Sequence, residues 1–122
     1  MFQFTGSLVT LATDEVEKML LFYSQLVGQE PVVYIPHVYA EFQLPGLQLG
    51  IFKPRELDRQ EFQNQAKSGM SLCLEVSDLV SAIAHLTNLG YPPPGAIVTM
   101  SHGKEIYAYD PGLNRLILHQ SG

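Results

Sequence analysis

Apolar and polar residues alternate along several short stretches of the chain. In residues 7–12, SLVTLA, every second side chain shares one face, which is the period of a β-strand. The same alternation recurs in residues 71–76, SLCLEV. Further strands are predicted in stretches rich in Val, Ile, Leu and Tyr that Pro or Gly separates, at residues 31–35, 38–44, 47–52, 96–100, 105–110 and 115–120.

Two longer stretches have the period of an amphipathic helix. In residues 13–29, apolar side chains recur three and four residues apart, and Gly28 is a natural stop. Residues 77–90 repeat the pattern up to Gly90. The predicted buried faces are Val16, Met19, Leu20 and Tyr23 in the first helix, and Leu79, Ala82, Ile83 and Leu86 in the second, each 63 positions later.

The start of each helix is also predicted from the sequence. Asp14 precedes the first apolar position of one helix, and Ser77 holds the corresponding place in the other. Short polar side chains accept hydrogen bonds from the first backbone N–H groups of a helix, so we expect both residues to be N-caps.

The order strand, helix, three strands therefore occurs twice. A Pro-Gly-Leu turn precedes the last strand of both halves. Between the halves, residues 53–69 are rich in charge and glutamine, which indicates a linker. Neither half can bury its sheet face alone, so we expect one α+β domain over residues 1–122, with units at about 4–52 and 70–120.

Composition and charge narrow the possible functions. The 122-residue chain is 46% hydrophobic and 16% charged, which is typical of a globular domain. Its net charge is −5 and its 7 Lys and Arg form no cluster, so we expect no nucleic-acid partner. It has no apolar run of membrane-spanning length and no basic leader, so we expect no membrane insertion and no signal peptide. The one cysteine, Cys73, fits a cytoplasmic location.

The duplicated unit resembles the vicinal oxygen chelate superfamily, which includes glyoxalase I, bleomycin-resistance proteins and extradiol dioxygenases. The resemblance rests on FYSQLVG near the end of the first helix and on YAYDPGLNRLILHQ at the last two strands, and it covers residues 4–120. It implies curled mixed sheets around a cleft. In the metalloenzymes of that superfamily, a divalent ion in the cleft acts as a Lewis acid on two neighbouring substrate oxygens.

The resemblance places the four metal-ligand positions at Leu8, Gly50, Ser71 and Ile117. None of these residues carries an imidazole, carboxylate or thiolate, so we expect no metal there and no other cofactor. A displaced metal site around Glu75 and His119 remains an alternative. The other three histidines, His37, His85 and His102, are expected to be surface or structural residues.

Strand alternation assigns two faces to the sheets. The residues expected under the helices are Val9, Leu11, Leu47, Leu49, Ile51, Leu72, Leu74, Val76, Leu116 and Leu118. The opposite face mixes apolar and polar groups, as the lining of a pocket does. The candidate ligand contacts are Gln48, Ser71, Cys73, Glu75, Arg115 and His119 on that face, together with Tyr39 and Tyr107.

Some roles on the mixed face stay open. Glu75 and Arg115 are expected either to pair with each other or to meet a polar ligand. The face itself could instead meet solvent or another subunit. No nucleophile lies beside a base in the sequence pattern, so we assign no catalytic residue.

Three functions follow from these features. The first is a metal-free protein that binds or sequesters an unknown small molecule, paired as a homodimer that covers exposed sheet edges. The alternative is a divalent-metal lyase or dioxygenase of the glyoxalase type with a displaced metal site. The third is a purely structural or interacting dimer. Whether the protein is an enzyme stays open.

Overall fold

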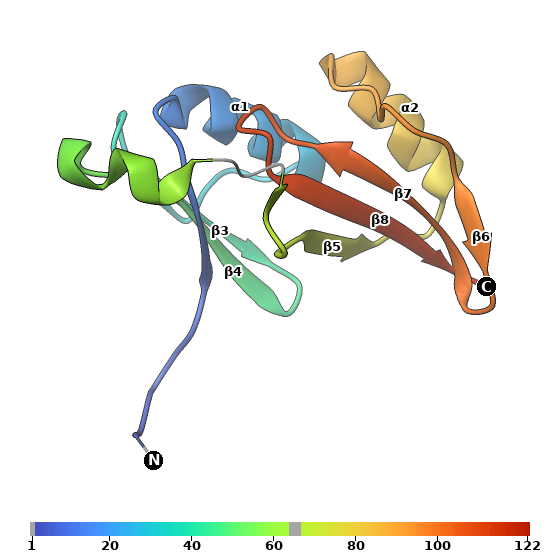
Figure 1. Cartoon of the computed structure of the whole chain (residues 1–122), viewed down its shortest axis with the longest axis horizontal. Helices are drawn as coiled ribbons and strands as arrows, with labels where there is room; N and C mark the ends of the chain where they lie inside the picture. The colour runs from blue at the N-terminus through green and yellow to red at the C-terminus, as the bar shows by residue number, and fades with distance from the viewer. Residues whose placement is uncertain (1, 64–66) are drawn as a thin grey trace. The chain divides into compact units, whose positions relative to one another are not determined.

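The structure is a computed structural model that describes residues 2–63 and 67–122 of the chain. The chain forms two compact units, Met1–Phe62 and Gln63–Gly122. Both have the element order strand, helix, three strands, which Figure 1 shows for the whole chain. The two units are described separately below.

Unit 1 is a four-stranded sheet with one α-helix packed on it. Its elements are β1 (Val9–Ala12), α1 (Val16–Val27), β2 (Val33–Ile35), β3 (Tyr39–Leu44) and β4 (Leu47–Phe52), followed by the 3-10 helix η1 (Glu56–Phe62). The strand order is β1-β4-β3-β2. The outer strand β1 runs parallel to β4, and the other neighbours are antiparallel.

Unit 2 repeats this topology. Its elements are β5 (Leu72–Glu75), α2 (Leu79–Leu89), β6 (Val98–Met100), β7 (Gly103–Tyr109) and β8 (Arg115–Ser121), which Figure 1 labels. The strand order is β5-β8-β7-β6, with β5 parallel to β8. The predicted fold class, α+β with a duplicated βαβββ unit, is confirmed.

The helix ends agree with the sequence, but the helix starts do not. Gly28 and Gly90 end α1 and α2 in the left-handed conformation, with φ of 67° and 97°. The N-cap of α2 is Asp78, not Ser77, and its carboxylate accepts hydrogen bonds from the Val80 and Ser81 N–H groups. Each helix therefore begins one residue later than the predicted cap implies.

The cap predicted at Asp14 is also wrong. Glu15 holds the N-cap position of α1 without a side-chain hydrogen bond. The Asp14 carboxylate instead binds Arg59 Nη2 at 2.5 Å, which ties η1 to the start of α1. The Asp14 side chain, which the local pattern assigned to the N-cap of α1, therefore forms a tertiary ion pair instead.

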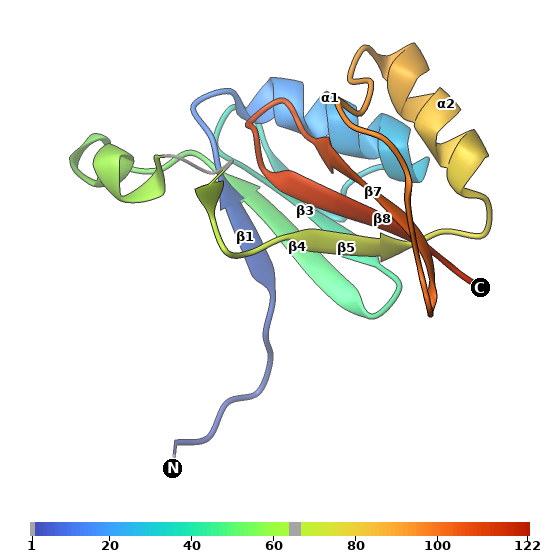
Figure 2. The ribbon, with the colours of Figure 1, turned by 45° about the vertical axis from the view of Figure 1, so that its right-hand side comes forward.

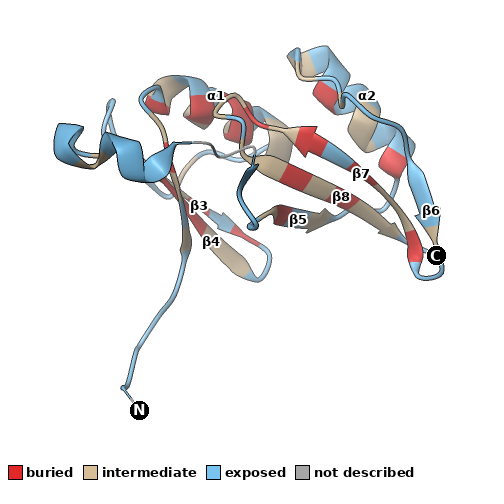
Figure 3. Cartoon of the chain, viewed as in Figure 1, coloured by how far each residue is buried: buried red, intermediate tan, exposed pale blue. Residues whose placement is uncertain are grey.

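The core lies between each helix and the facing side of its own sheet. Leu49 and Ile51 in unit 1, and Leu116 and Leu118 in unit 2, are buried as predicted (Figure 3). Of the other residues predicted on that face, Leu72 is buried and the rest, Val9, Leu11, Leu47, Leu74 and Val76, are partly exposed. The buried face of α1 differs slightly from the predicted one: Phe22 is buried, and Leu20 is only partly buried.

The repeated Pro-Gly-Leu sequence forms two different turns. In unit 1 a two-residue turn at Pro45 and Gly46 joins Leu44 directly to its partner Leu47. In unit 2 the paired residues are Tyr109 and Arg115, so five residues form the loop. The buried Asp110 carboxylate holds that loop by accepting hydrogen bonds from the Gly112 and Asn114 N–H groups and from the Asn114 side chain.

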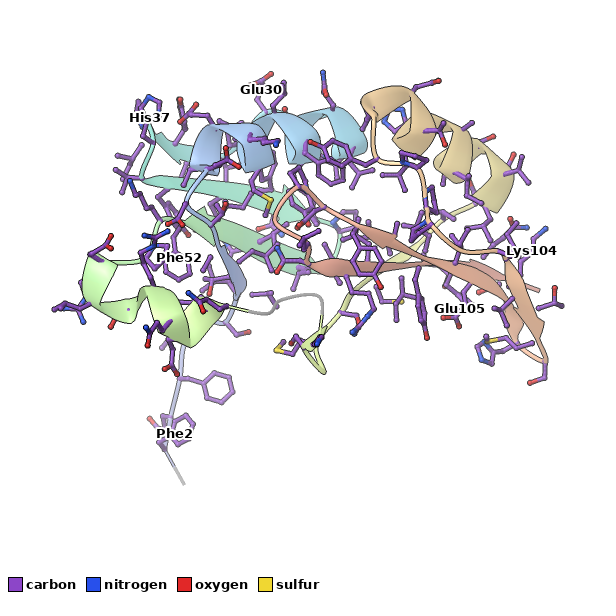
Figure 4. All side chains as sticks on the ribbon, turned by 45° about the horizontal axis from the view of Figure 1, so that its top comes forward. Phe2, Glu30, His37, Phe52, Lys104 and Glu105 are labelled. Carbon is purple, nitrogen blue, oxygen red and sulfur yellow. The ribbon has the colours of Figure 1, made fainter. Side chains whose placement is uncertain are left out.

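Part of the predicted linker packs on unit 1. Residues 56–62 form η1, and the Phe62 ring meets Phe52 edge-on with ring centroids 5.4 Å apart. Figure 4 shows Phe52 pointing toward η1. Residues 64–66 of the predicted linker lie outside the described residues.

Candidate functional site

The open face of the unit 2 sheet, away from α2, carries two rows of side chains that could contact a ligand or take part in chemistry. Strand register places Glu75, His119 and Glu105 side by side across β5, β8 and β7. Figure 4 shows Glu105 on this face. The next row, two residues along each strand, contains Cys73, Ile117 and Tyr107. Four of the predicted contacts, Cys73, Glu75, Tyr107 and His119, thus share one face.

Hydrogen bonds join Glu75, His119 and His102 into a chain. Glu75 Oε1 lies 2.7 Å from His119 Nδ1, and His119 Nε2 lies 3.0 Å from His102 Nδ1. A carboxylate only accepts, so His119 Nδ1 carries a proton, and His119 Nε2 then accepts from His102 when both rings are neutral. The His119 side chain is only 13% exposed, whereas that of Glu75 is 58% exposed. The open face therefore presents polar groups whose orientation is fixed by hydrogen bonds.

The Glu75 carboxylate is held at both oxygens. Its second oxygen accepts hydrogen bonds from the backbone N–H and the hydroxyl of Ser121, both at 2.9 Å. The hydrogen bond from His119 lowers the pKa of Glu75 below its ordinary value, and the bonds from Ser121 lower it further. Glu75 is therefore an ionised hydrogen-bond acceptor at neutral pH.

Cys73 is not activated as a nucleophile. Burial raises the pKa of its thiol, and the nearby carboxylates of Glu105 and Glu75 raise it further. The side chain therefore stays protonated at neutral pH. It can contribute a small polarisable contact to a ligand but no thiolate.

Two further predicted contacts, Arg115 and Ser71, bind each other. Arg115 Nη1 donates to Ser71 Oγ and to the Ser68 carbonyl, both at 2.9 Å. The guanidinium thereby holds the segment that leads into β5. Arg115 does not pair with Glu75, whose hydrogen bonds go to His119 and Ser121, so that alternative is wrong. A ligand contact at Arg115 or Ser71 stays a prediction.

Unit 1 has its own polar cluster on the open face of its sheet. The Tyr39 hydroxyl donates to Glu41 Oε1 at 2.6 Å, and Gln48 Nε2 donates to Glu41 Oε2 at 3.3 Å. The hydrogen bond to Glu41 raises the pKa of Tyr39 to about 12, with burial adding to the effect. Tyr39 and Gln48 were predicted contacts, and both are organised by Glu41.

Glycine at position 50 allows this cluster to form. A Cβ atom added to Gly50 would lie 2.8 Å from the Tyr39 hydroxyl oxygen and 3.4 Å from Leu8 Cδ1. The first distance is shorter than a van der Waals contact. The Tyr39 side chain can lie close to the backbone of β4 because position 50 has no side chain.

Sequence reasoning missed three of these polar residues. Glu41 and Glu105 each lie two residues from a tyrosine on the same strand, so alternation could have found them. His102 was predicted to be a surface or structural residue. It lies in the turn between β6 and β7, where no strand period indicates which way a side chain points.

The remaining histidines lie away from the open faces' polar clusters. His37 forms the β2–β3 turn with a φ of 63°, and its backbone N–H donates to the Glu17 carboxylate at 2.7 Å. The Tyr34 hydroxyl donates to the same carboxylate, and together these bonds lower the pKa of Glu17. His85 occupies an exposed position on α2.

Comparison with known proteins gives matches in structure and none in sequence. No protein-family model and no curated protein matches the chain. A glyoxalase/bleomycin resistance protein from Catenulispora acidiphila superimposes with a TM-score of 0.70 at 19% identity, over 95% of this chain and 97% of that one. A lactoylglutathione lyase from Agrobacterium tumefaciens gives 0.71 at 18% identity, over 97% and 95%. A bleomycin-binding protein complexed with bleomycin gives 0.68 at 20% identity, over 98% and 100%.

The chain has the vicinal oxygen chelate fold. At these identities the similarity concerns the fold alone, and it agrees with the duplicated βαβββ topology that the sequence resemblance implied. In the part of the chain that the structure describes, no helix has both the length and the apolar character to cross a bilayer.

The residues at the metal positions implied for this fold do not suit a divalent ion. In unit 1, Leu8 and the Tyr39 ring lie over Gly50, and the Tyr39 hydroxyl is already bound to Glu41. In unit 2, the Ser71 hydroxyl accepts from Arg115, and Ile117 has no donor atom. Across residues 2–63 and 67–122, no three side chains of His, Cys, Asp or Glu converge as a metal site would require.

Proposed function

We propose that the protein binds a small organic molecule on the open face of its unit 2 sheet, as a binding or sequestering protein that needs no metal at the family positions. One observation carries this proposal. The hydrogen-bonded polar side chains Glu75 and His119 lie in the row next to Tyr107 and Ile117 on the same sheet face. A bleomycin-binding protein shares the fold, which supports small-molecule binding as the general role.

The chemistry of the face fits recognition better than catalysis. Tyr107 is 51% exposed and offers an aromatic surface on which a flat ligand can stack. Glu75 and His119 are already held by neighbouring groups, so little side-chain entropy is lost when a ligand binds to them. Specific contacts therefore come from fixed polar groups beside an apolar wall, as in ligand pockets.

Ligand screening by thermal shift tests the proposal. A ligand at 100 times its dissociation constant is expected to stabilise the protein by about 2.7 kcal/mol. Tyr107→Ala is expected to weaken binding by about tenfold through lost stacking. Leu21→Ala, an exposed apolar residue on α1, is the matched control and should bind as the parent does.

Two results would contradict the proposal. One is a confirmed ligand whose affinity is unchanged by both Tyr107→Ala and Glu75→Gln. The other is about one tightly bound divalent metal ion per chain in protein purified without chelator or metal column, lost on His119→Ala.

We also propose that the protein is a homodimer in the cytoplasm. The outer strand β2 is exposed along its whole length, and its side chains Val33, Tyr34 and Ile35 are 41%, 45% and 50% exposed. Exposed apolar edge strands tend to be covered by another chain. The single cysteine, Cys73, is unpaired, which fits a reducing compartment.

A further inference from the structure

A second candidate binding site lies at the hairpin end of the unit 1 sheet. A groove of about 350 Å³ runs between residues 7–9, which lead into β1, and the β3–β4 hairpin. Figure 2 shows that these two segments lie at the same end of the sheet. Leu8 lies on the same open face as Gln43 and Gln48, so Leu8 gives the groove an apolar wall and the two glutamines give it two amides. A groove of this size suits a small ligand.

The two amides are held side by side, each with a defined orientation. Gln43 and Gln48 are direct partners across β3 and β4. Gln43 Nε2 donates to the carbonyls of Leu44 and Leu47, at 3.0 and 3.4 Å. Gln48 Nε2 donates to Glu41 Oε2. Carbonyl and carboxylate oxygens only accept, so the nitrogen end of each amide must be the end that binds the protein.

The carbonyl oxygens of both amides, together with the second N–H of Gln48, are therefore the groups left for a ligand. No residue of the described chain donates a hydrogen bond to either oxygen. The two acceptors come from adjacent strands and line one groove. Such a pair matches a planar group that presents two parallel N–H donors.

The charge around the groove favours a cation. None of the lining residues carries a positive charge. The Glu41 carboxylate accepts a hydrogen bond from the Gln48 amide nitrogen, which polarises the amide and strengthens its carbonyl as an acceptor. An anionic group would meet two carbonyl acceptors and a nearby carboxylate, with only the Ser7 hydroxyl and one Gln48 N–H as side-chain donors and no positive charge.

We propose that this groove binds a cationic amidine or guanidine group carried on an apolar body. The two N–H donors bind the carbonyl oxygens of Gln43 and Gln48, and the apolar body packs on Leu8. The site belongs to unit 1 and is independent of the ligand proposed for the unit 2 sheet.

Benzamidine and benzoate test the proposal as a matched pair of probe molecules. They share shape and size, but one presents donors and the other acceptors. In ¹H–¹⁵N spectra of the full chain, benzamidine is expected to shift the amide signals of residues 7–9 and 43–48 in a saturable way, and benzoate is not. The double variant Gln43→Met/Gln48→Met is expected to weaken benzamidine binding by about tenfold, the effect of losing two hydrogen bonds. Gln29→Met, at an exposed position after α1, is the control and should leave binding unchanged.

Several results would overturn the proposal: benzoate shifting the same signals with equal affinity, benzamidine shifts at these residues that do not saturate, or unchanged affinity in the double variant. If the double variant does not fold, Gln48→Met and the comparison of the two molecules on the parent protein still decide the question. Signals of residues 73–75 and 117–119 report the unit 2 site separately, so failure at one site does not imply failure at the other.

Discussion

At the scale of single residues, the glycine at position 50 leaves room for a polar cluster on the open face of unit 1. Gly50 stands where the fold family's metalloenzymes are expected to place a ligand, and the Tyr39 side chain occupies the space above it. Tyr39 in turn holds Glu41, which holds Gln48. One backbone position without a side chain thus supports a three-residue polar cluster.

Gly50→Ala is expected to destabilise the protein by about 1–3 kcal/mol, because the new methyl group displaces the Tyr39 hydroxyl from Glu41. Urea unfolding measures the change. Gly95→Ala is the control, since no atom lies within 4 Å of a Cβ at that position. The cost should shrink when Gly50→Ala is combined with Tyr39→Phe; an equal cost in both backgrounds would show that the hydroxyl is not involved.

Glu75 makes stability depend on pH in a defined direction. Its pKa in the folded protein lies below its ordinary value of 4.5, so its ionised form stabilises the fold at higher pH. That contribution is fully present above the unfolded pKa and is lost as pH falls through the folded pKa. We expect Glu75→Gln to be less stable than the parent at pH 7, and the difference to shrink steadily below about pH 4.5.

Urea unfolding at a series of pH values checks this expectation. Glu30→Gln is the control, because Glu30 is exposed and makes no ion pair or hydrogen bond with a described residue. A stability difference for Glu75→Gln that stays constant from pH 7 to pH 3 would refute the role of the ionised carboxylate.

At the scale of secondary structure elements, the sequence identified the last residues of the two helices but not their N-cap residues. Glycine in the left-handed conformation ends both helices, as the sequence predicted. Two polar residues in succession, Ser77 and Asp78, could each have capped α2. Only the backbone path into the helix selects between them, and it places the Asp78 carboxylate next to the free N–H groups.

Asp78→Ala is therefore expected to cost about 1 kcal/mol, the usual value for loss of an N-cap side chain. Ser77→Ala, the residue that the sequence pattern favoured, is expected to change stability by less than about 0.5 kcal/mol. Thermal and urea unfolding of the two variants compare the positions directly. The reverse order of effects would restore Ser77 as the cap.

At the scale of the whole molecule, the duplication gives each unit a sheet with two outer strands. In unit 1 these are β1 and β2, and in unit 2 they are β5 and β6. The strand β2 is only three residues long, between Pro31 and Pro36, which limits how far another strand can pair with it. Its apolar side chains remain exposed in the single chain.

The proposed homodimer is expected to bury these side chains. Light scattering at micromolar concentration should give the mass of two chains. Ile35→Lys, which places a charge on the exposed edge, should shift the protein toward the mass of one chain, whereas Val80→Lys on the exposed side of α2 should not. A monomer mass for the parent protein at that concentration would refute the dimer.

The sequence by itself determined the β-strands and the two α-helices, their order and the faces of the strands, but not η1 or the exact helix starts. These depend on local periodicity and on glycine and proline, whose preferences act over a few residues. The identity of the hydrogen-bonding partners was decided only by the tertiary structure. Glu75 and His119 are 44 residues apart, and His102 joins them from a turn. Strand register and turn geometry determine such partners. No local sequence pattern encodes either of them, so the hydrogen-bonded chain of Glu75, His119 and His102 could be recognised only in the tertiary structure.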